Sequence, residues 1–155
     1  MSYTGIRHFT FRTAPDLPYT ELTLKGHSKT RTSGKRLRVL IADDSEAVRK
    51  SLERLLRVLP NLELVGHAAD GLQALEAVDL LEPDVLILDM RMPELTGLEV
   101  LKKLKAIRHQ LCIIVFTGES QEHYREECLA AGADHFFEKG SQTMDLVEAL
   151  KGLTR

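Results

Sequence analysis

Val85-Leu86-Ile87-Leu88, followed at once by Asp89-Met90-Arg91-Met92-Pro93, is the stretch that indicates the fold of this 155-residue chain most directly. Its first four residues form a short, continuous apolar run. Such a run is typical of a strand that is buried on both faces, as in a parallel sheet covered by helices on its two sides. The stretch therefore predicts an α/β protein with a polar loop after a central strand.

Similar apolar runs alternate with helical patterns along the chain from Leu37 onward. A run of four to seven residues followed by apolar residues at helical spacing is the pattern of a βα unit. Five such units fit, with strands expected at 37–41, 62–68, 85–88, 112–116 and 135–138. Helices are expected between and after them, the fourth from about Gln121 to Ala131 and the last ending at about Leu153. The fourth helix is mostly polar.

The composition is that of an ordinary globular domain, with 43% hydrophobic and 28% charged residues. No apolar run approaches the ~20 residues that cross a bilayer, and the first residues lack the apolar core of a secretory signal. We therefore expect a cytoplasmic protein without a membrane segment. Cys112 and Cys128 belong to no Cys/His cluster, so we expect two buried thiols.

Residues 1–36 break the rhythm of the βα units. They carry seven Lys or Arg and two acids, a net charge of +5. Since the whole chain has a net charge of −2, residues 37–155 carry −7. We expect a basic, flexible extension at 1–35 and a single domain at 36–155. The alternation in Phe9-Thr10-Phe11 leaves open a short strand or a docked segment.

Five polar residues follow the expected strands, and this placement predicts a site. Asp43 and Asp44 follow the first strand, Asp89 the third, Thr117 the fourth and Lys139 the fifth. The carboxyl ends of parallel strands meet at one edge of a sheet, which is where ligands bind in such folds. We therefore expect these five side chains to surround one pocket.

Each of these residues also has a plain structural interpretation. Asp44 or Ser45 could cap the first helix, and Asp89, Thr117 and Lys139 could be ordinary loop or surface residues. For any one of these residues alone, the structural interpretation is the better one. The coincidence of three carboxylates, a hydroxyl and an ammonium at the same sheet edge favours a site.

The chemistry of this set points to a divalent cation and a phosphoryl group. Three neighbouring carboxylates repel one another and raise at least one pKa unless a cation is present. Mg²⁺ prefers such oxygen ligands, Mn²⁺ is an alternative, and a set without Cys or His does not suit zinc. The Asp89 carboxylate could attack phosphorus, while Lys139 and Thr117 would meet the equatorial oxygens.

Taken together, these segments resemble the receiver domain of two-component response regulators, over roughly Arg36 to Leu153. The resemblance is carried by four segments: Leu40-Ile41-Ala42-Asp43-Asp44-Ser45, the loop from Asp89 to Gly97, Val115-Phe116-Thr117-Gly118, and Gly132-Ala133-Asp134-His135-Phe136-Phe137-Glu138-Lys139. It implies a doubly wound, flavodoxin-like α/β fold, with a five-stranded parallel sheet in the order 2-1-3-4-5 flanked by five helices.

The resemblance also implies roles for the site residues. Asp89 would be the phosphoacceptor, with Lys139 as the phosphoryl clamp. Asp44 would bind the metal directly and Asp43 through water, and the backbone carbonyl of Arg91 would complete the protein ligands.

For switching, the resemblance implies that Thr117 moves toward the phosphoryl group and that Phe136 is the switch aromatic. Arg91 and Glu119 occupy positions where the family tunes the phosphoryl lifetime. The output surface would be the face formed by the fourth helix, the fifth strand and the fifth helix.

The implied partners are a histidine kinase or a histidine phosphotransfer protein as donor, and a protein target. We expect no DNA-binding output domain, since the chain ends soon after the last helix, and a homodimer is left open. The domain would not be an enzyme, apart from catalysing phosphoryl transfer to and from its own Asp89.

Two rival functions are weighed against this one. A magnesium-dependent phosphatase with an aspartyl intermediate would carry its nucleophile on the first strand, with a second Asp two residues later; here Asp89 follows the third strand and Arg91 stands at that position. A receiver-like binding module that is never phosphorylated is the other rival, against which the complete set of site residues argues.

Two residues depart from the family pattern. Gly118 stands where Ala is more usual, and Gly140 follows Lys139 where many receivers have Pro after a cis peptide. The isomer of the Lys139–Gly140 peptide is therefore left open.

Overall fold

The structure is a computed structural model that describes residues 34–119 and 121–154, so the predictions for residues 1–33 lie outside the described residues. Strands and helices alternate in five βα units, as predicted. The strands are β1 (Leu37–Ala42), β2 (Leu62–Ala68), β3 (Val85–Leu88), β4 (Cys112–Thr117) and β5 (His135–Glu138). The helices are α1 (Glu46–Val58), α2 (Gly71–Leu81), α3 (Gly97–Ile107), α4 (Glu122–Ala130) and α5 (Thr143–Leu153).

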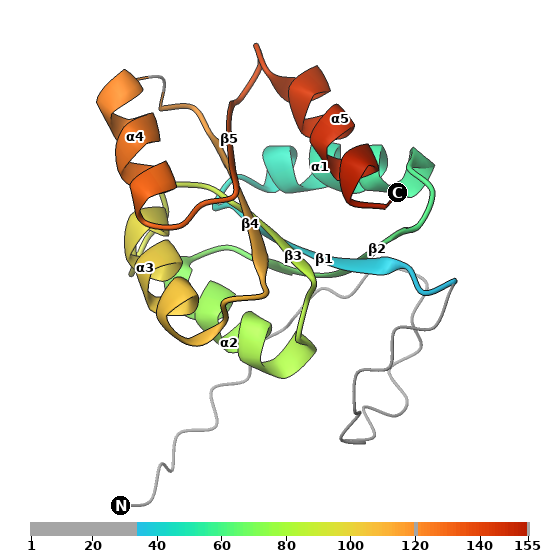
Figure 1. The fold of residues 1–155 in the computed structure, drawn as a ribbon, viewed down its shortest axis with the longest axis horizontal. Coiled ribbons are helices and arrows are strands. Elements are labelled where there is room, and N and C mark those ends of the chain that lie inside the picture. Colours follow the sequence, from blue (N-terminus) through green and yellow to red (C-terminus); the bar gives the residue numbers. More distant parts are fainter. Residues whose placement is uncertain (1–33, 120, 155) are drawn as a thin grey trace, which may run out of the picture.

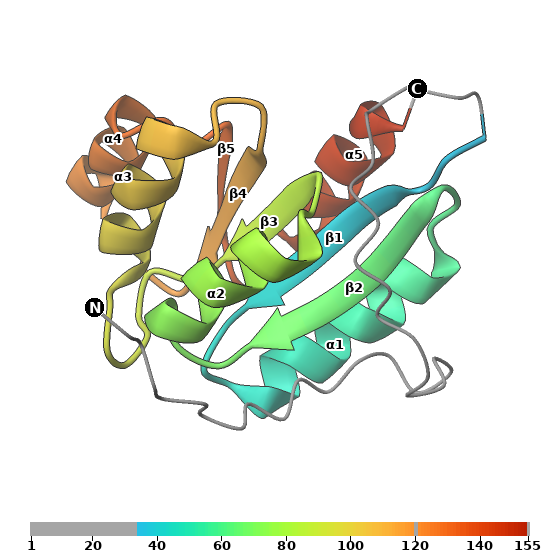
Figure 2. The ribbon, with the colours of Figure 1, turned by 90° about the horizontal axis from the view of Figure 1, so that it is seen from below.

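The five strands form one parallel sheet in the order β2-β1-β3-β4-β5, which confirms the predicted topology. Figures 1 and 2 show α2, α3 and α4 on one face of the sheet and α1 and α5 on the other. The sheet is therefore the middle layer of three, and β5 lies at one of its edges, beside β4.

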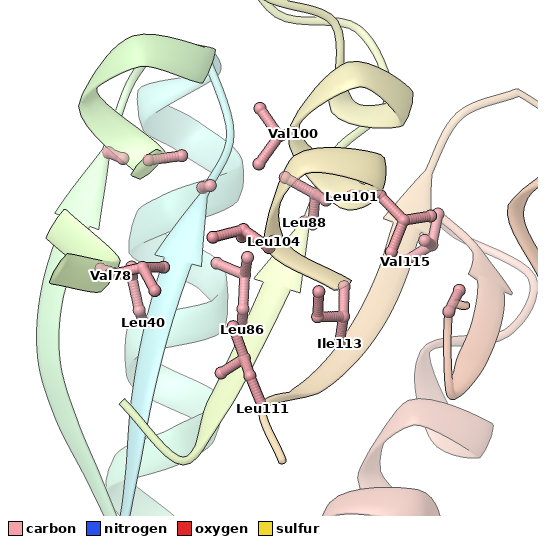
Figure 3. Packing of buried hydrophobic residues seen from close by; sticks show 14 of the residues in the cluster. Leu40, Val78, Leu86, Leu88, Val100, Leu101, Leu104, Leu111, Ile113 and Val115 are labelled. Atoms are coloured by element: carbon pink, nitrogen blue, oxygen red, sulfur yellow. The ribbon is translucent and has the colours of Figure 1, made fainter. Parts of the chain in front are cut away.

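The apolar run of β3 is buried on both faces, for the reason that its sequence suggests. Leu86 and Leu88 pack with the helices α2, α3 and α4, and Figure 3 shows them among the side chains of this cluster. Val85 and Ile87 point to the opposite face, where they pack with α1 and α5. Alternating side chains of one strand thus contribute to two cores.

The two phenylalanines of β5 divide in the same way. Phe136 is 2% exposed and belongs to the core under α2, α3 and α4. Phe137 packs against the core on the α1 and α5 side and stacks on His135. The two rings therefore face opposite sides of the strand, as neighbouring residues of a strand do.

The helices differ in whether a side chain caps their N-terminus. The side chains of Ser45, Asp70 and Thr96 accept hydrogen bonds from the first turns of α1, α2 and α3, and Thr96 forms a capping box with Glu99. At the start of α4, Gln121 makes no such side-chain bond. The first turn of α4 is therefore less well stabilised than those of α1, α2 and α3.

The cysteines differ in burial. Cys128 is fully buried, as predicted, whereas Cys112 is only partly buried. Burial raises the pKa of each thiol to about 11, so both are protonated at neutral pH. None of the described helices is long and apolar enough to span a bilayer.

Two glycines account for the departures from the family pattern. None of the described peptide bonds is cis, so the Lys139–Gly140 bond is trans, and Gly140 has a φ of +86°. Proline cannot adopt a positive φ, and this backbone conformation suits glycine. At Gly118 an added Cβ would meet nothing within 4 Å, so the structure has room for the more usual alanine.

The loop after β3 returns close to its own start, and this contact requires glycine. The N–H group of Gly97 donates a hydrogen bond to the carbonyl of Met90 at 2.9 Å. A Cβ on Gly97 would lie 2.1 Å from the carbonyl oxygen of Asp89 and 2.7 Å from the Cα of Met90. Neither backbone atom can move without displacing Asp89.

We therefore predict that Gly97→Ala destabilises the domain by about 2–3 kcal/mol, the cost of inserting a methyl group where backbone atoms already lie. Gly118→Ala is the matched control, and its free energy of unfolding should stay within about 0.5 kcal/mol of the wild-type value. Urea unfolding of the three proteins measures the difference. Equal stabilities for the two variants would contradict the assigned role of Gly97.

Candidate functional site

The five residues predicted from the strand ends lie together at the carboxyl edge of the sheet. Carboxylate oxygens of Asp43, Asp44 and Asp89 all lie within 4.8 Å of one another. Thr117 is the last residue of β4, and Lys139 follows β5 directly. The sheet order places β1, β3, β4 and β5 side by side, which explains how residues almost a hundred positions apart form one cluster.

Lys139 is the cation at the centre of this cluster. Its Nζ lies 2.6 Å from Oδ2 of Asp43 and 3.2 Å from Oδ2 of Asp89. Burial disfavours the charged form, but the hydrogen bond to Asp43 and the charges of both carboxylates outweigh it and raise the pKa of Lys139. The side chain is therefore a fixed ammonium ion between two buried acids.

Asp43 is held at four points. Its Oδ1 accepts a 2.8 Å bond from the N–H of Ser45, its Oδ2 meets Lys139, and its own N–H donates to the carbonyl of Ala68 at 3.0 Å. Nη1 of Arg49, on α1, donates to the backbone carbonyl of Asp43 at 2.7 Å. These contacts fix both the backbone and the carboxylate of Asp43.

The pKa of the Asp43 carboxyl lies above its usual range, as the sequence predicted for at least one acid of the cluster. The main cause differs from the one expected. Burial of this residue, which is 2% exposed, raises the pKa most, whereas repulsion by Asp89 is a smaller contribution. The bonds from Lys139 and Ser45 lower the pKa and only partly offset the burial.

Asp44 differs from its neighbours because its side chain is exposed. The capping alternative is also resolved: Ser45 Oγ, not Asp44, accepts the bond from the N–H of Val48 that caps α1. The Asp44 carboxylate therefore lies at the solvent side of the cluster, beside two buried carboxylates.

Asp89 is buried, with only 4% of its surface exposed. Its N–H donates to the carbonyl of Ala42 at 2.9 Å, so the residue is still bonded to β1 at the point where β3 has ended. Thr117 is fully buried, and its Oγ1 accepts a 3.3 Å bond from the N–H of Glu119. Its carbonyl accepts from the N–H of Lys139 at 2.8 Å, which ties the end of β4 to the lysine.

Arg91 and Glu119, which lie in two separate loops, form an ion pair between Nε of Arg91 and Oε1 of Glu119. The Arg91 side chain is 81% exposed and the Glu119 side chain 22%. The pair joins the loop that follows Asp89 to the loop that follows Thr117, beside the cluster. The role of the Arg91 carbonyl as a metal ligand stays a prediction.

The donor set fits a hard divalent ion. It consists of carboxylate oxygens from three residues, two of them buried, and contains neither a thiolate nor an imidazole. Mg²⁺ and Mn²⁺ accept such ligands, whereas zinc sites use mainly His and Cys. A cation would also offset the unfavourable burial of the Asp43 charge.

Two arginines near the site were missed by the sequence reasoning. Arg49 bonds the carbonyl of Asp43, and Arg125, on α4, bonds the carbonyl of Phe136. Each contact joins a helical side chain to a backbone oxygen six or eleven residues away. No residue pattern marks such an acceptor, because every residue carries a carbonyl group.

Comparison with known proteins agrees with this geometry. Residues 39–151 match the family model of the response regulator receiver domain. The chain is 39% identical over 119 residues to the response regulator MprA of Mycobacterium ulcerans, and 34% identical over 112 residues to the nitrate/nitrite response regulator protein NarL of Escherichia coli. These alignments cover 77% and 72% of the chain, and 50% and 52% of the relatives.

Solved structures give the same result. The response regulator domain of Thermotoga maritima CheB superposes with a TM-score of 0.71 at 30% identity, over 76% of this chain and 96% of that one. The chain belongs to the response regulator receiver domain family of two-component systems. It spans about half the length of the two regulators that it matches in sequence.

The buried acids make the stability of the domain depend on Lys139. We predict that Lys139→Met lowers the free energy of unfolding by about 2 kcal/mol at pH 7, because two buried carboxylates lose their shared counter-ion. The loss should shrink on acidification. The pKa of Asp43 is already raised and rises further without the ammonium, so protonation of Asp43 relieves the unfavourable charge as the pH falls toward 4.

Lys151→Met is the control for this prediction, since the side chain of Lys151 forms an exposed ion pair with Glu148. Its effect should stay below about 0.5 kcal/mol. Urea unfolding at several pH values measures both variants. A loss in Lys139→Met that is the same at pH 4.5 and pH 7 would show that the variant is destabilised by something other than the unpaired carboxylates.

Proposed function

We propose that this domain is a phosphoryl-accepting switch whose acceptor is Asp89. The observation that carries the proposal is the placement of the Asp89 carboxylate, buried and 3.2 Å from the Lys139 ammonium, within a cluster of two further acids. Such an arrangement neutralises negative charge at a carboxylate that can act as a nucleophile. The full extent of the unit, with a basic extension at 1–35 and the receiver at 36–155, is part of the proposal.

The proposed reaction is transfer of a phosphoryl group from a phosphohistidine. An Asp89 carboxylate oxygen attacks phosphorus, the O–P bond forms, the P–N bond breaks, and the imidazole leaves with its electron pair and takes up a proton. Charge on the transferred group is spread over three equatorial oxygens. Lys139 meets one of these oxygens, and the Thr117 hydroxyl donates to another. Attack of water on phosphorus then breaks the O–P bond, releases inorganic phosphate and returns Asp89 to its free carboxylate.

A divalent cation is the proposed cofactor. Asp44 and Asp89 would hold it directly and Asp43 through water, and the carbonyl of Arg91 would complete the protein ligands. When bound, Mg²⁺ or Mn²⁺ supplies neutralisation of the phosphoryl oxygens. Exposure of Asp44 leaves the cluster an open side toward solvent.

The switch is proposed to start at Thr117. A phosphoryl group on Asp89 adds charge and acceptor oxygens, so the Thr117 hydroxyl gains a bond by moving inward. Phe136 then changes its packing, and the face of α4, β5 and α5 presents a different shape to a protein target. Arg91 and Glu119, which pair beside the cluster, are proposed to tune the lifetime of the phosphoryl group.

The proposed donor is a histidine kinase or a histidine phosphotransfer protein. A binding module that is never phosphorylated is the alternative, against which the complete set of site residues argues. Phosphoryl uptake separates the two functions directly.

We predict that acetyl phosphate with magnesium adds one phosphoryl group to the wild-type protein and none to Asp89→Asn, because the amide cannot act as the nucleophile. Intact-protein mass spectrometry measures the uptake. Asp145→Asn, which changes an exposed acid on α5, should behave as wild type. Uptake in Asp89→Asn would move the acceptor elsewhere, and no uptake in any protein would favour the binding module.

Magnesium should stabilise the folded domain through Asp44. At ten times its Kd the ion contributes about 1.4 kcal/mol, which raises the Tm by roughly 5 °C for a domain of this size. Asp44→Ala should lose most of this rise, whereas Asp145→Ala should keep it. Thermal unfolding with and without magnesium gives the comparison, and an equal rise in Asp44→Ala would place the ion away from the cluster.

A further inference from the structure

Arg125 makes two contacts with Phe136 that the proposed chemistry does not use. Its Nη1 donates a 3.1 Å hydrogen bond to the carbonyl oxygen of Phe136. Its guanidinium carbon lies 5.6 Å from the centre of the Phe136 ring, within the range of a cation–π interaction. One side chain of α4 thus holds both the backbone and the ring of a residue on the edge strand β5.

The remaining attachment of α4 to the domain is slight. Cys128 is the one buried residue of this helix, and Tyr124 is only partly buried against the core. The start of the helix lacks a side-chain cap, and Glu127 lies 4.0 Å from Lys102 of α3 in an exposed ion pair. The contacts of Arg125 are therefore a large share of what fixes α4 to β5.

Phe136 lies on the same face of the sheet as Thr117. In the parallel pairing of β4 and β5, Phe136 is opposite Val115 and Glu138 is opposite Thr117. Side chains two residues apart on a strand point to the same face, so Val115, Thr117 and Phe136 all face the side covered by α4. Thr117 and the ring that Arg125 contacts therefore lie on the same face of two neighbouring strands.

A second contact links α4 to the acceptor. Sγ of Cys128 lies 3.4 Å from Sδ of Met90, the residue that follows Asp89. The helix is thus in contact with the acceptor loop through Cys128 and with β5 through Arg125. Both contacts must be repacked if α4 moves when Asp89 is modified.

We propose that Arg125 is the latch of the switch: it holds α4 against β5, and the Phe136 ring in its present packing, until phosphorylation of Asp89 favours a state in which α4 is released. The inference rests on the proposed function, since it names the residue that opposes the change. A guanidinium suits this role because its hydrogen bond and its ring contact are both directional, and both are lost together when the helix shifts. Arg125 is a positioning residue that acts through Phe136.

The test begins without any phosphoryl donor. In Arg125→Met, which removes the charge and the hydrogen bond but keeps an apolar stem, amide exchange across residues 121–139 should rise by about tenfold, the factor expected when one charge-assisted bond is lost. Lys102→Met is the control, since it removes another cation that contacts α4. It should leave this exchange unchanged.

The second measurement uses beryllium fluoride with magnesium, a phosphoryl mimic that is not transferred. If the latch opposes the state that binds the mimic, Arg125→Met should bind it several-fold more tightly, because a larger fraction of the protein is already released. Should Arg125→Met fail to fold, Arg125→Lys keeps the charge, lacks the flat guanidinium face, and should show both effects at a smaller size.

The outcomes are distinguishable. Unchanged exchange in Arg125→Met, a rise shared equally by residues 37–58, or unchanged affinity for beryllium fluoride would overturn the latch. If the wild-type protein takes up no phosphoryl group and binds no beryllium fluoride, the proposed function fails. The latch is then still judged by the donor-free exchange, which requires no modification of Asp89.

Discussion

The burial of acids at the carboxyl edge of a parallel sheet is the constraint on which the rest of this structure depends. Asp43 and Asp89 are almost inaccessible to water, and the ammonium of Lys139 partly offsets the cost of burying their charges. The lysine must come from β5, two strands away from β3, so the site exists only when β1, β3, β4 and β5 are assembled in order. The bond from the N–H of Lys139 to the carbonyl of Thr117 holds the lysine beside the end of β4.

Most of the fold could be predicted because burial leaves a direct trace in the sequence. A strand covered on both faces reads as a continuous apolar run, as in Val85–Leu88, and the polar residues after such runs were found at one edge of the sheet. The predictable part ends where the partner of a side chain is a backbone atom. The need for glycine at position 97 comes from a carbonyl eight residues earlier, and the contact between Arg49 and Asp43 is of the same kind.

The site is built unequally on its two sides. Around Asp43 the acidic loop is bonded to α1, β2 and Lys139, and Ser45 caps the helix that follows. Around Thr117 the following helix, α4, has no side-chain cap and one buried residue. Local stability therefore falls from the acidic loop toward α4. The well-bonded region around Asp43 keeps the site in shape when Asp89 is modified. The resulting movement is expected in the less stable region around Thr117 and α4.

For a helix that is expected to move, such as α4, attachment by a polar contact is more suitable than further apolar packing. Apolar burial is non-directional and changes gradually with area, so a helix anchored by leucines would resist movement in every direction. The bond from Arg125 to the Phe136 carbonyl is lost over a small displacement, because hydrogen bonds weaken steeply with distance and angle. In the proposed latch, the presence or loss of this bond separates two states of α4. Such a division is what allows a modification of modest free energy to change the population of a surface.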